Sequence, residues 1–233
     1  MAIKELPRHI AFIMDGNGRW AQQRGVPRVE GHRAGSEAME KICRYAGRLG
    51  IPYLTFYAFS TENWKRPQEE VDALMELMAE YLAQLPKHMG DERLRVLGDL
   101  SALNADLQRK IEQAVEKTKD NTGLTVNIAF NYGSRAEITR AVQTLARRCA
   151  AGELAPDQID EAAVTQALYT GATPDPDLII RPSGEKRLSN FLMWQAAYAE
   201  LIFMDVLWPD FDDNCLDLAL AEYQQRDRRF GGR

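Results

Sequence analysis

Short apolar stretches of strand length alternate along the chain with segments in which apolar residues recur at helical spacing. The strand-like stretches span 10–14, 53–59, 94–97, 124–130, 178–180 and 201–206. The segments with helical spacing span 34–49, 69–85, 104–119, 136–149 and 215–224. Strands and helices that alternate in this way form layered α/β structures. The pattern therefore predicts an α/β fold with a central, largely parallel six-stranded sheet flanked by helices.

The chain carries no internal repeat and no linker long enough to divide it, so we expect one domain over residues 1–233. Lys and Arg number 29 against 34 Asp and Glu, and the net charge of −5 disfavours a nucleic-acid-binding role.

The three cysteines are far apart, which favours a reducing cytoplasm and neither a zinc site nor a disulfide framework. No apolar run approaches the ~18 residues of a membrane span. We expect a protein that is neither exported nor integral to a membrane.

Polar loops follow the first, second and fifth predicted strands, where ligands of parallel sheets bind. The first loop reads Met14-Asp15-Gly16-Asn17-Gly18-Arg19-Trp20, and Arg28 and His32 follow it. Two glycines let backbone N–H groups approach an anion closely, so this loop suggests a phosphate cradle with a carboxylate at its rim. His32, one helical turn beyond Arg28, could donate to the same phosphate. The alternative is a strand-to-helix turn with solvated arginines.

The second loop, Ser60-Thr61-Glu62-Asn63-Trp64-Lys65-Arg66, combines a hydroxyl, an amide, an indole and a guanidinium. A helix-capping box would explain Ser60 and its neighbours, but it leaves Trp64 and Arg66 unexplained. The fifth strand is followed by a loop of similar chemistry that runs from Arg181 to Asn190. Arg outnumbers Lys by 21 to 8, and Arg binds phosphate oxygens bidentately. These loops predict a site for an anionic small molecule with more than one phosphate group.

The predicted helix over 69–85 carries a broad apolar stripe. Its members are Val71, Leu74, Met75, Met78, Leu82 and Leu85. Such a stripe is most often part of the core, although two methionines also suit the wall of an apolar channel. Both interpretations stay open at this point.

Three motifs together resemble those of the cis-prenyltransferases, and among them the bacterial enzymes that make undecaprenyl diphosphate. They are the segment 9–21 followed by Gly31-His32, the segment 59–64 with Arg66-Pro67, and Arg181-Pro182-Ser183-Gly184-Glu185 followed by Arg187-Leu188-Ser189-Asn190-Phe191. The resemblance covers nearly the whole chain in order. One departure is Pro182, where Thr is common, and it affects only fine contacts near Arg181.

The resemblance implies elongation of farnesyl diphosphate by isopentenyl diphosphate units with cis double bonds, using Mg²⁺. The product would be undecaprenyl diphosphate, a lipid carrier precursor for cell-wall polysaccharides such as peptidoglycan. Asp15 and Asn63 would be catalytic, and Asp15 and Glu200 would bind the metal, Glu200 across a homodimer interface. The substrate-binding residues would be Gly16, Asn17, Gly18, Arg19, Trp20, Arg28, His32, Ser60, Thr61, Glu62, Trp64, Arg66, Arg181, Arg187, Leu188 and Ser189.

The proton acceptor of the implied reaction is not fixed by the motif. A carboxamide such as that of Asn63 is a very weak base, so we assign proton removal to a diphosphate oxygen or Asp15, with Asn63 orienting the groups. The resemblance also implies that the C-terminal Arg229, in an Arg-x-Gly ending, reaches into the site of the partner subunit, whereas the alternative is a basic tail with no role. Transient membrane association would accompany product release, and the sequence does not fix product length.

Two alternative functions are a phosphohydrolase and a non-catalytic partner subunit, and each requires a sequence feature that differs from this chain. A phosphohydrolase with Asp15 as nucleophile needs a second Asp two residues later, where this chain has Asn17. A non-catalytic partner subunit would lack the Asp-Gly-Asn-Gly-Arg loop, which is intact here. The D-D-x-x-D pairs of trans-prenyltransferases are also missing from the sequence.

Overall fold

The computed structural model describes residues 6–88, 90–171 and 173–226. Its centre is a six-stranded sheet in the order β3-β4-β2-β1-β5-β6, and every neighbouring pair is parallel. The strands are β1 (His9–Ile13), β2 (Tyr53–Ser60), β3 (Arg93–Leu97), β4 (Thr125–Tyr132), β5 (Leu178–Arg181) and β6 (Glu200–Phe203). The six predicted strands and the α/β class are confirmed, and the sheet is wholly rather than largely parallel.

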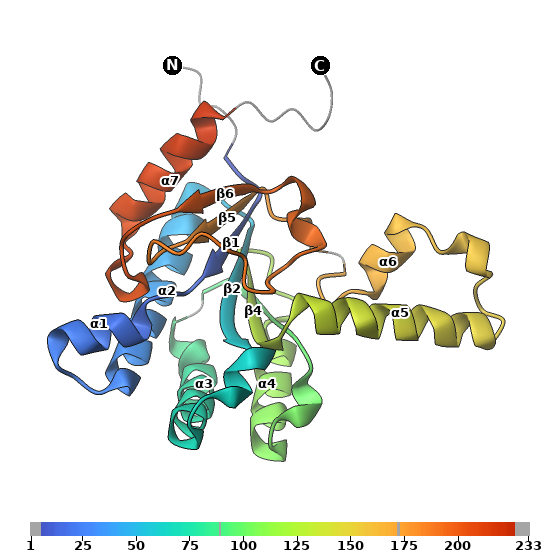
Figure 1. Cartoon of the computed structure of the whole chain (residues 1–233), viewed down its shortest axis with the longest axis horizontal. Coiled ribbons are helices and arrows are strands. Elements are labelled where there is room, and N and C mark those ends of the chain that lie inside the picture. Colours follow the sequence, from blue (N-terminus) through green and yellow to red (C-terminus); the bar gives the residue numbers. More distant parts are fainter. Residues whose placement is uncertain (1–5, 89, 172, 227–233) are drawn as a thin grey trace.

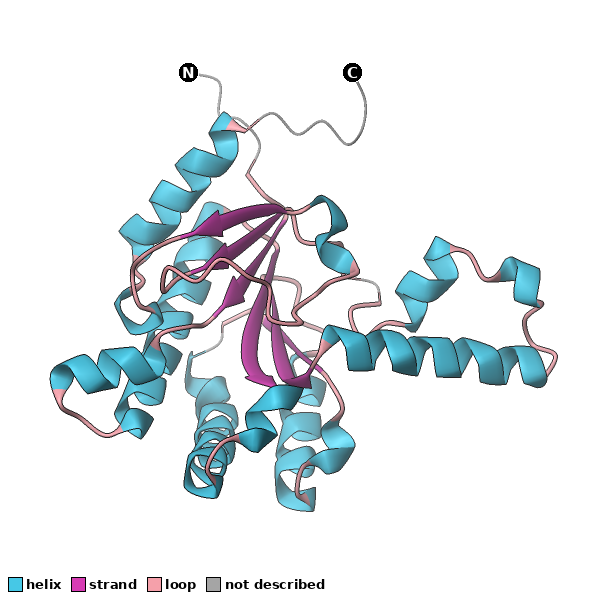
Figure 2. Cartoon of the chain, in the orientation of Figure 1, coloured by secondary structure: helices cyan, strands magenta, loops and turns pink. Residues whose placement is uncertain are grey.

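Helices follow most strands and lie on both sides of the sheet (Figures 1 and 2). The α-helices are α1 (Asn17–Arg24), α2 (Arg28–Leu49), α3 (Gln68–His88), α4 (Ala105–Thr118), α5 (Ser134–Ala150), α6 (Glu161–Ala167) and α7 (Asp213–Gln225). Short 3₁₀ turns are η1 (Thr61–Lys65), η2 (Leu100–Ala102), η3 (Pro156–Gln158), η4 (Gln195–Tyr198) and η5 (Trp208–Asp210). The five predicted helices are present, whereas α1 and α6 were not predicted.

The larger core lies on the sheet face covered by α2, α3, α4 and α7. Burial of these apolar helix stripes supplies the main driving force for folding. Phe12 and Phe56 stack at 5.1 Å in this core, and the Trp208 ring packs on both. The Trp208 indole nitrogen donates to the Gly35 carbonyl at 2.8 Å. Trp208 therefore connects β1 and β2 with α2, beside the carboxyl edge of the sheet.

A smaller core lies on the opposite face, under the chain that follows β5. Phe191 and Leu192 are fully buried there, and the Phe191 ring stacks on Tyr57 at 4.5 Å. α5 begins at the end of β4 and, together with α6, projects from the sheet (Figure 1). This packing holds the loop after β5 against the end of β2. None of the helices that the structure describes is long and apolar enough to cross a membrane.

Candidate active site

The loops that follow β1, β2 and β5 meet at the carboxyl edge of the sheet and surround two adjoining polar cavities. The first cavity measures about 540 Å³ and is lined by Asp15, Ser60, Asn63, Arg181 and Ser189, among others. The second measures about 280 Å³, and its lining includes residues 14–19, Arg28 and Glu70. Asp15, Asn17, His32 and Arg66 line both cavities. The three predicted polar loops are thus brought together around Asp15.

The Asp15 carboxylate is held through one of its two oxygens. Its Oδ2 accepts hydrogen bonds from Arg181 Nη2 at 2.7 Å and from Ser183 Oγ at 2.8 Å. Oδ1 lies 3.7 Å from Arg19 Nη2. Burial alone would raise the pKa of Asp15, but these hydrogen bonds and the Arg181 and Arg19 charges outweigh it and hold the pKa below its ordinary value. Asp15 is therefore an ionised carboxylate with one oxygen available to a ligand.

A glycine lets the chain turn directly after Asp15. Gly16 has φ of +109°, in the region that favours glycine, and a Cβ there would lie 2.9 Å from Leu207 Cδ2. The backbone N–H of Trp208 donates to the Asp15 carbonyl at 3.0 Å and fixes the loop from the other side. α1 begins at Asn17 immediately afterwards, and the residues of its first turn, whose N–H groups lack partners inside the helix, line the second cavity beside Asp15. This is the arrangement that the phosphate-cradle interpretation requires.

The Arg181 side chain organises the loop after β5. Only 4% of the residue is exposed. Besides its bonds to Asp15, its Nη1 donates to Ser189 Oγ at 2.8 Å and to the Arg187 carbonyl oxygen. Arg187 itself points outward, with its guanidinium paired with Glu185. Arg181 thus joins β1 to the loop, while the Arg187 side chain is 60% exposed and has its ion pair at the surface.

Three basic side chains converge on Glu70, a residue that the sequence analysis missed. Arg28 Nη1 and Arg66 Nη1 each lie 2.7 Å from one of its carboxylate oxygens, and His32 Nε2 lies 3.5 Å away. The Glu70 side chain is only 9% exposed. The Glu70 carboxylate therefore lies where the Arg28 and Arg66 guanidinium groups and the His32 ring converge. The Arg66–Glu70 spacing of four residues was a visible signal for one of these pairs.

Asn17 determines which nitrogen of His32 carries the proton. Its amide Nδ2 lies 3.3 Å from His32 Nδ1, so Nδ1 accepts and the neutral ring carries its hydrogen on Nε2, toward Glu70. Burial, aided by the Arg66 charge, lowers the pKa of His32 below its usual value. His32 is consequently a neutral hydrogen-bond donor that faces the second cavity.

The loop after β2 uses Asn63 as a cap. Asn63 Oδ1 accepts a hydrogen bond from the Ser60 backbone N–H at 3.0 Å. The segment thus has the predicted capping box, but its second member is Asn63 and not the expected Glu62. Ser60 and Asn63 still line the first cavity, together with Glu62 and Arg66. The hydrogen bond from the backbone therefore holds the Asn63 amide in one orientation at the edge of the cavity.

Several predicted site residues do not line either polar cavity. These are Trp20, Thr61, Trp64, Arg187, Leu188 and Glu200. The Trp20 indole donates to Asp210 Oδ1 at 2.8 Å, and the Trp64 indole donates to Asn131 Oδ1 at 2.7 Å. Their substrate-binding roles stay predictions.

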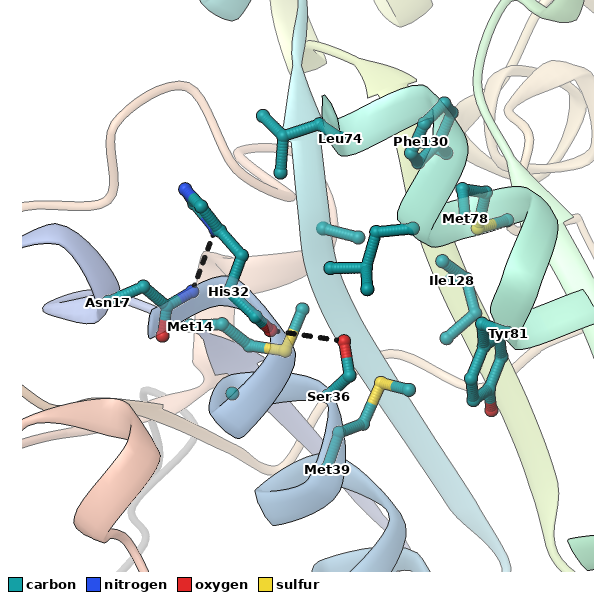
Figure 3. Close-up of a pocket in the computed structure, with 13 residues that line it drawn as sticks. Met14, Asn17, His32, Ser36, Met39, Leu74, Met78, Tyr81, Ile128 and Phe130 are labelled. Atoms are coloured by element: carbon teal, nitrogen blue, oxygen red, sulfur yellow. Dashed lines mark hydrogen bonds between the residues drawn. The ribbon is translucent and has the colours of Figure 1, made fainter. Parts of the chain in front are cut away.

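An apolar pocket opens beside the polar cavities between α2 and α3 (Figure 3). Met14, Asn17, His32 and Ala58 line both this pocket and the first cavity. Its deeper wall is formed by Met39, Leu74, Leu77, Met78, Tyr81, Ile128 and Phe130. The volume is only about 60 Å³. The stripe on α3 therefore contributes both to the core and to a narrow apolar pocket, so the two interpretations of the sequence coexist.

The only carboxylate that lines both polar cavities, among the described residues, is that of Asp15, which makes it the candidate ligand for a divalent cation. Among the described residues, no group of three or more His, Cys, Asp or Glu side chains is arranged to hold a metal. Mg²⁺, however, is commonly bound by one or two carboxylates together with substrate phosphates, and Asp15 Oδ1 suits that role. Glu200 is the first residue of β6 and is paired with Leu178 of β5, which in turn is paired with Ile10 of β1. Asp15 lies beyond the other end of β1, so the two carboxylates are about 15 Å apart along the strand direction. The two carboxylates of one chain therefore cannot share an ion.

Comparisons with known proteins agree with this geometry. A family model described as putative undecaprenyl diphosphate synthase matches residues 13–231. An isoprenyl transferase of Heliobacterium mobile is 53% identical over 97% of this chain and 88% of that protein. The chain belongs to this prenyltransferase family. A Micrococcus luteus relative, named ditrans,polycis-undecaprenyl-diphosphate synthase ((2E,6E)-farnesyl-diphosphate specific), is 48% identical over 98% of this chain and 92% of its own length.

Solved structures of the family share the fold. Lavandulyl diphosphate synthase from Lavandula x intermedia, in complex with dimethylallyl diphosphate, has a TM-score of 0.93 and 40% identity over 97% of this chain and 98% of its own. A probable undecaprenyl diphosphate synthase from Campylobacter jejuni has a TM-score of 0.78 and 36% identity over 98% and 100%. The resemblance seen in the motifs is confirmed, and membership of the family argues against the phosphohydrolase alternative.

Proposed function

We propose that this prenyltransferase extends farnesyl diphosphate with isopentenyl diphosphate units through cis double bonds to make undecaprenyl diphosphate, a lipid carrier precursor in cell-wall polysaccharide synthesis. The observation that carries the proposal is the junction at Asp15. Two polar cavities and one apolar pocket open there, and Asn17 and His32 line all three. A reaction that transfers the apolar chain of one prenyl diphosphate to a second one needs two polar sites for the diphosphates beside an apolar pocket for the chain.

The two diphosphates would lie on opposite sides of Asp15. The corner formed by residues 16–19, Arg28 and His32 adjoins the apolar pocket, so it suits the allylic diphosphate with its hydrocarbon tail. The loop after β5, with Arg181, Arg187 and Ser189, would hold isopentenyl diphosphate. Ser60, Asn63 and Arg66 line the cavity between these places and would position the reacting carbons.

Mg²⁺ would be held by Asp15 Oδ1 and by substrate oxygens, because Oδ2 is committed to Arg181 and Ser183. When bound, it supplies positive charge that stabilises the departing diphosphate. Glu200 would contribute only from the partner subunit of a homodimer. It now pairs with Arg226 at 2.7 Å, three residues before Arg229, which lies outside the described residues. The proposal also includes cytoplasmic placement, which three widely spaced cysteines favour.

The residues of the chain supply charge and orientation to the proposed reaction. The C1–O bond of the allylic diphosphate breaks, and the leaving group's negative charge is met by Arg19, Arg28 and the His32 Nε2–H. The isopentenyl double bond then forms a new bond to C1, and a proton leaves C2 of the isopentenyl unit. The lowered pKa of Asp15 makes it a weak base, and the Asn63 oxygen is engaged. A diphosphate oxygen is therefore the proposed proton acceptor.

Incubation with farnesyl diphosphate, radiolabelled isopentenyl diphosphate and Mg²⁺, followed by sizing of the extracted lipids, tests the proposal. We expect chain growth to a C55 product that requires both substrates. Asp15→Asn preserves the shape of the side chain while removing its charge, and should lower turnover by roughly 100-fold or more with allylic affinity retained. Release of phosphate from farnesyl diphosphate without chain growth would contradict the proposal and revive the phosphohydrolase alternative.

A further inference from the structure

Asn190 bridges the loop after β5 to two other elements of the site. It lies directly after Ser189 and lines the first cavity. Its φ of +63° is in the left-handed region, where Asn is better tolerated than most residues. This conformation directs its backbone and its side chain toward separate partners.

The first partner is the N-terminus of α5. The backbone N–H of Ser134 donates to the Asn190 carbonyl at 2.8 Å, and that of Arg135 donates to Asn190 Oδ1 at 2.9 Å. Ser134 Oγ also accepts a hydrogen bond from the Met193 backbone N–H at 3.0 Å. The first turn of a 17-residue helix therefore fixes the loop through N–H groups that have no partner inside the helix.

The second partner is η1, on the opposite wall of the cavity. Asn190 Nδ2 donates to Glu62 Oε1 at 2.9 Å, across 128 residues of sequence. This hydrogen bond contributes to a pKa of Glu62 below its ordinary value, although burial acts in the opposite direction. Gly133 makes the contact possible, because a Cβ there would lie 2.8 Å from Asn190 Nδ2 and 2.5 Å from Thr61 Oγ1.

From these contacts we propose that Asn190 is a positioning residue that holds the isopentenyl diphosphate loop against the loop of Asn63. One side chain joins the α5 N-terminus, η1 and the segment that carries Ser189, whose hydroxyl is bonded to Arg181. Asn190 does not line the cavity at the allylic corner, which is built on α1 and α2. The inference rests on the proposed function, and it predicts an effect on one substrate only.

A reciprocal pair of substitutions tests the bridge. Asn190→Asp keeps the acceptor for Arg135 but places a second carboxylate against Glu62. We expect about a tenfold loss of affinity for isopentenyl diphosphate, the scale of one hydrogen bond to a charged group. Glu62→Gln alone is the reference for the double variant: its glutamine oxygen can still accept from Asn190, and any direct effect of Glu62 on the ligand is measured there and subtracted. Glu62→Gln/Asn190→Asp re-forms the bond with its direction reversed, and should recover most of the tenfold loss.

Calorimetry measures the affinity of each variant for isopentenyl diphosphate and, separately, for farnesyl thiodiphosphate, so the comparison of single and double variants does not depend on turnover. Recovery in the double variant with unchanged allylic affinity supports the bridge. A double variant as weak as Asn190→Asp, or equal loss for both ligands, overturns it. If wild-type chain growth fails, the proposed function falls, while the binding cycle still decides the role of Asn190.

Gly133→Ala provides an independent variant should Asn190→Asp fold poorly. The φ of Gly133 is −160°, extended backbone that alanine adopts readily, so the added Cβ acts mainly by displacing Asn190 Nδ2 from its place beside η1, where it donates to Glu62. We expect the same selective weakening of isopentenyl diphosphate with the thermal unfolding midpoint nearly retained. Wild-type affinity for isopentenyl diphosphate in folded Gly133→Ala would contradict the proposal.

Discussion

Arg181 and Asp15 meet through a single carboxylate oxygen. Arg181 Nη2 and Nε approach Asp15 Oδ2 at 2.7 and 3.3 Å, while Oδ1 stays on the side of Arg19. The β1 and β5 loops are thus joined by one edge of the carboxylate, and the other edge faces the cavities. Asp15 therefore has a structural role through Oδ2, and the proposed function assigns ligand binding to Oδ1.

Glu70 gives the first prediction, because it neutralises the basic corner when no ligand is bound. If the allylic diphosphate binds at this corner, as proposed, it competes with this carboxylate for Arg28 and Arg66. Glu70→Gln should therefore strengthen binding of farnesyl thiodiphosphate by roughly fivefold, and the gain should shrink at high salt. Isothermal titration calorimetry at two salt concentrations measures both effects. Weaker binding in the variant would mean that Glu70 orients the arginines rather than competing with the ligand.

The apolar pocket gives a prediction on product length. Met78 lines the pocket, whereas Leu82 lies one turn later, is 5% exposed and does not line it. Met78→Trp should shorten the lipid product while the first condensation continues at a similar rate. Leu82→Trp is the matched control and should mainly reduce the free energy of unfolding, by roughly 1–3 kcal/mol. Unchanged product length in a folded Met78→Trp would assign this position to the core alone.

A buried histidine predicts how stability depends on pH. His9 is fully buried between Thr55 Oγ1 and the Pro174 carbonyl, and burial lowers its pKa to about 4. Below pH 6.5 His9 is protonated in the unfolded chain, whereas in the folded chain it stays neutral down to about pH 4. The free energy of unfolding should therefore fall as pH drops through this window, with His9 contributing about 2 kcal/mol of loss by pH 5.

Urea denaturation of wild type and His9→Gln at pH 7 and pH 5 checks this prediction. The wild type should lose more stability between the two values than the variant does, because the variant lacks the titrating group. His32 is also buried and titrates in the same direction, but it is common to both proteins. Equal losses would show that His9 is not the source of the pH dependence.

β1, β2, β4 and β5 could be predicted from the sequence because each is a short apolar stretch buried on both faces. The edge strands β3 and β6 are only partly buried, and a short run of apolar residues was the signal for each of them. α1 was not predicted, since Ala21 is its only buried residue and two glycines flank its start. α2 begins at Arg28 rather than near residue 34, because its first turns carry polar residues that bind across the site. Polar helical turns at a ligand site lack the apolar periodicity on which such predictions depend.

The polar loops were recognised as site components because their residue types are unusual for turns. The contacts between them were not predictable in the same way. Glu70 lies 42 residues from Arg28, and Asn190 lies 128 residues from Glu62. No local pattern encodes such pairs, since they arise only when parallel strands bring their carboxyl ends to one edge. Trp20 and Trp64, conspicuous in the sequence, instead donate to Asp210 and Asn131.

The most direct test of the account is a crystal structure of the enzyme with farnesyl thiodiphosphate, isopentenyl diphosphate and Mg²⁺. We predict the allylic diphosphate beside Arg28 and the N-terminus of α1, with its tail between α2 and α3. Isopentenyl diphosphate should lie on the other side of Asp15, with Arg187 turned inward from Glu185, and the metal should contact Asp15 Oδ1. Both diphosphates on one side of Asp15, or a tail outside the apolar pocket, would contradict the account.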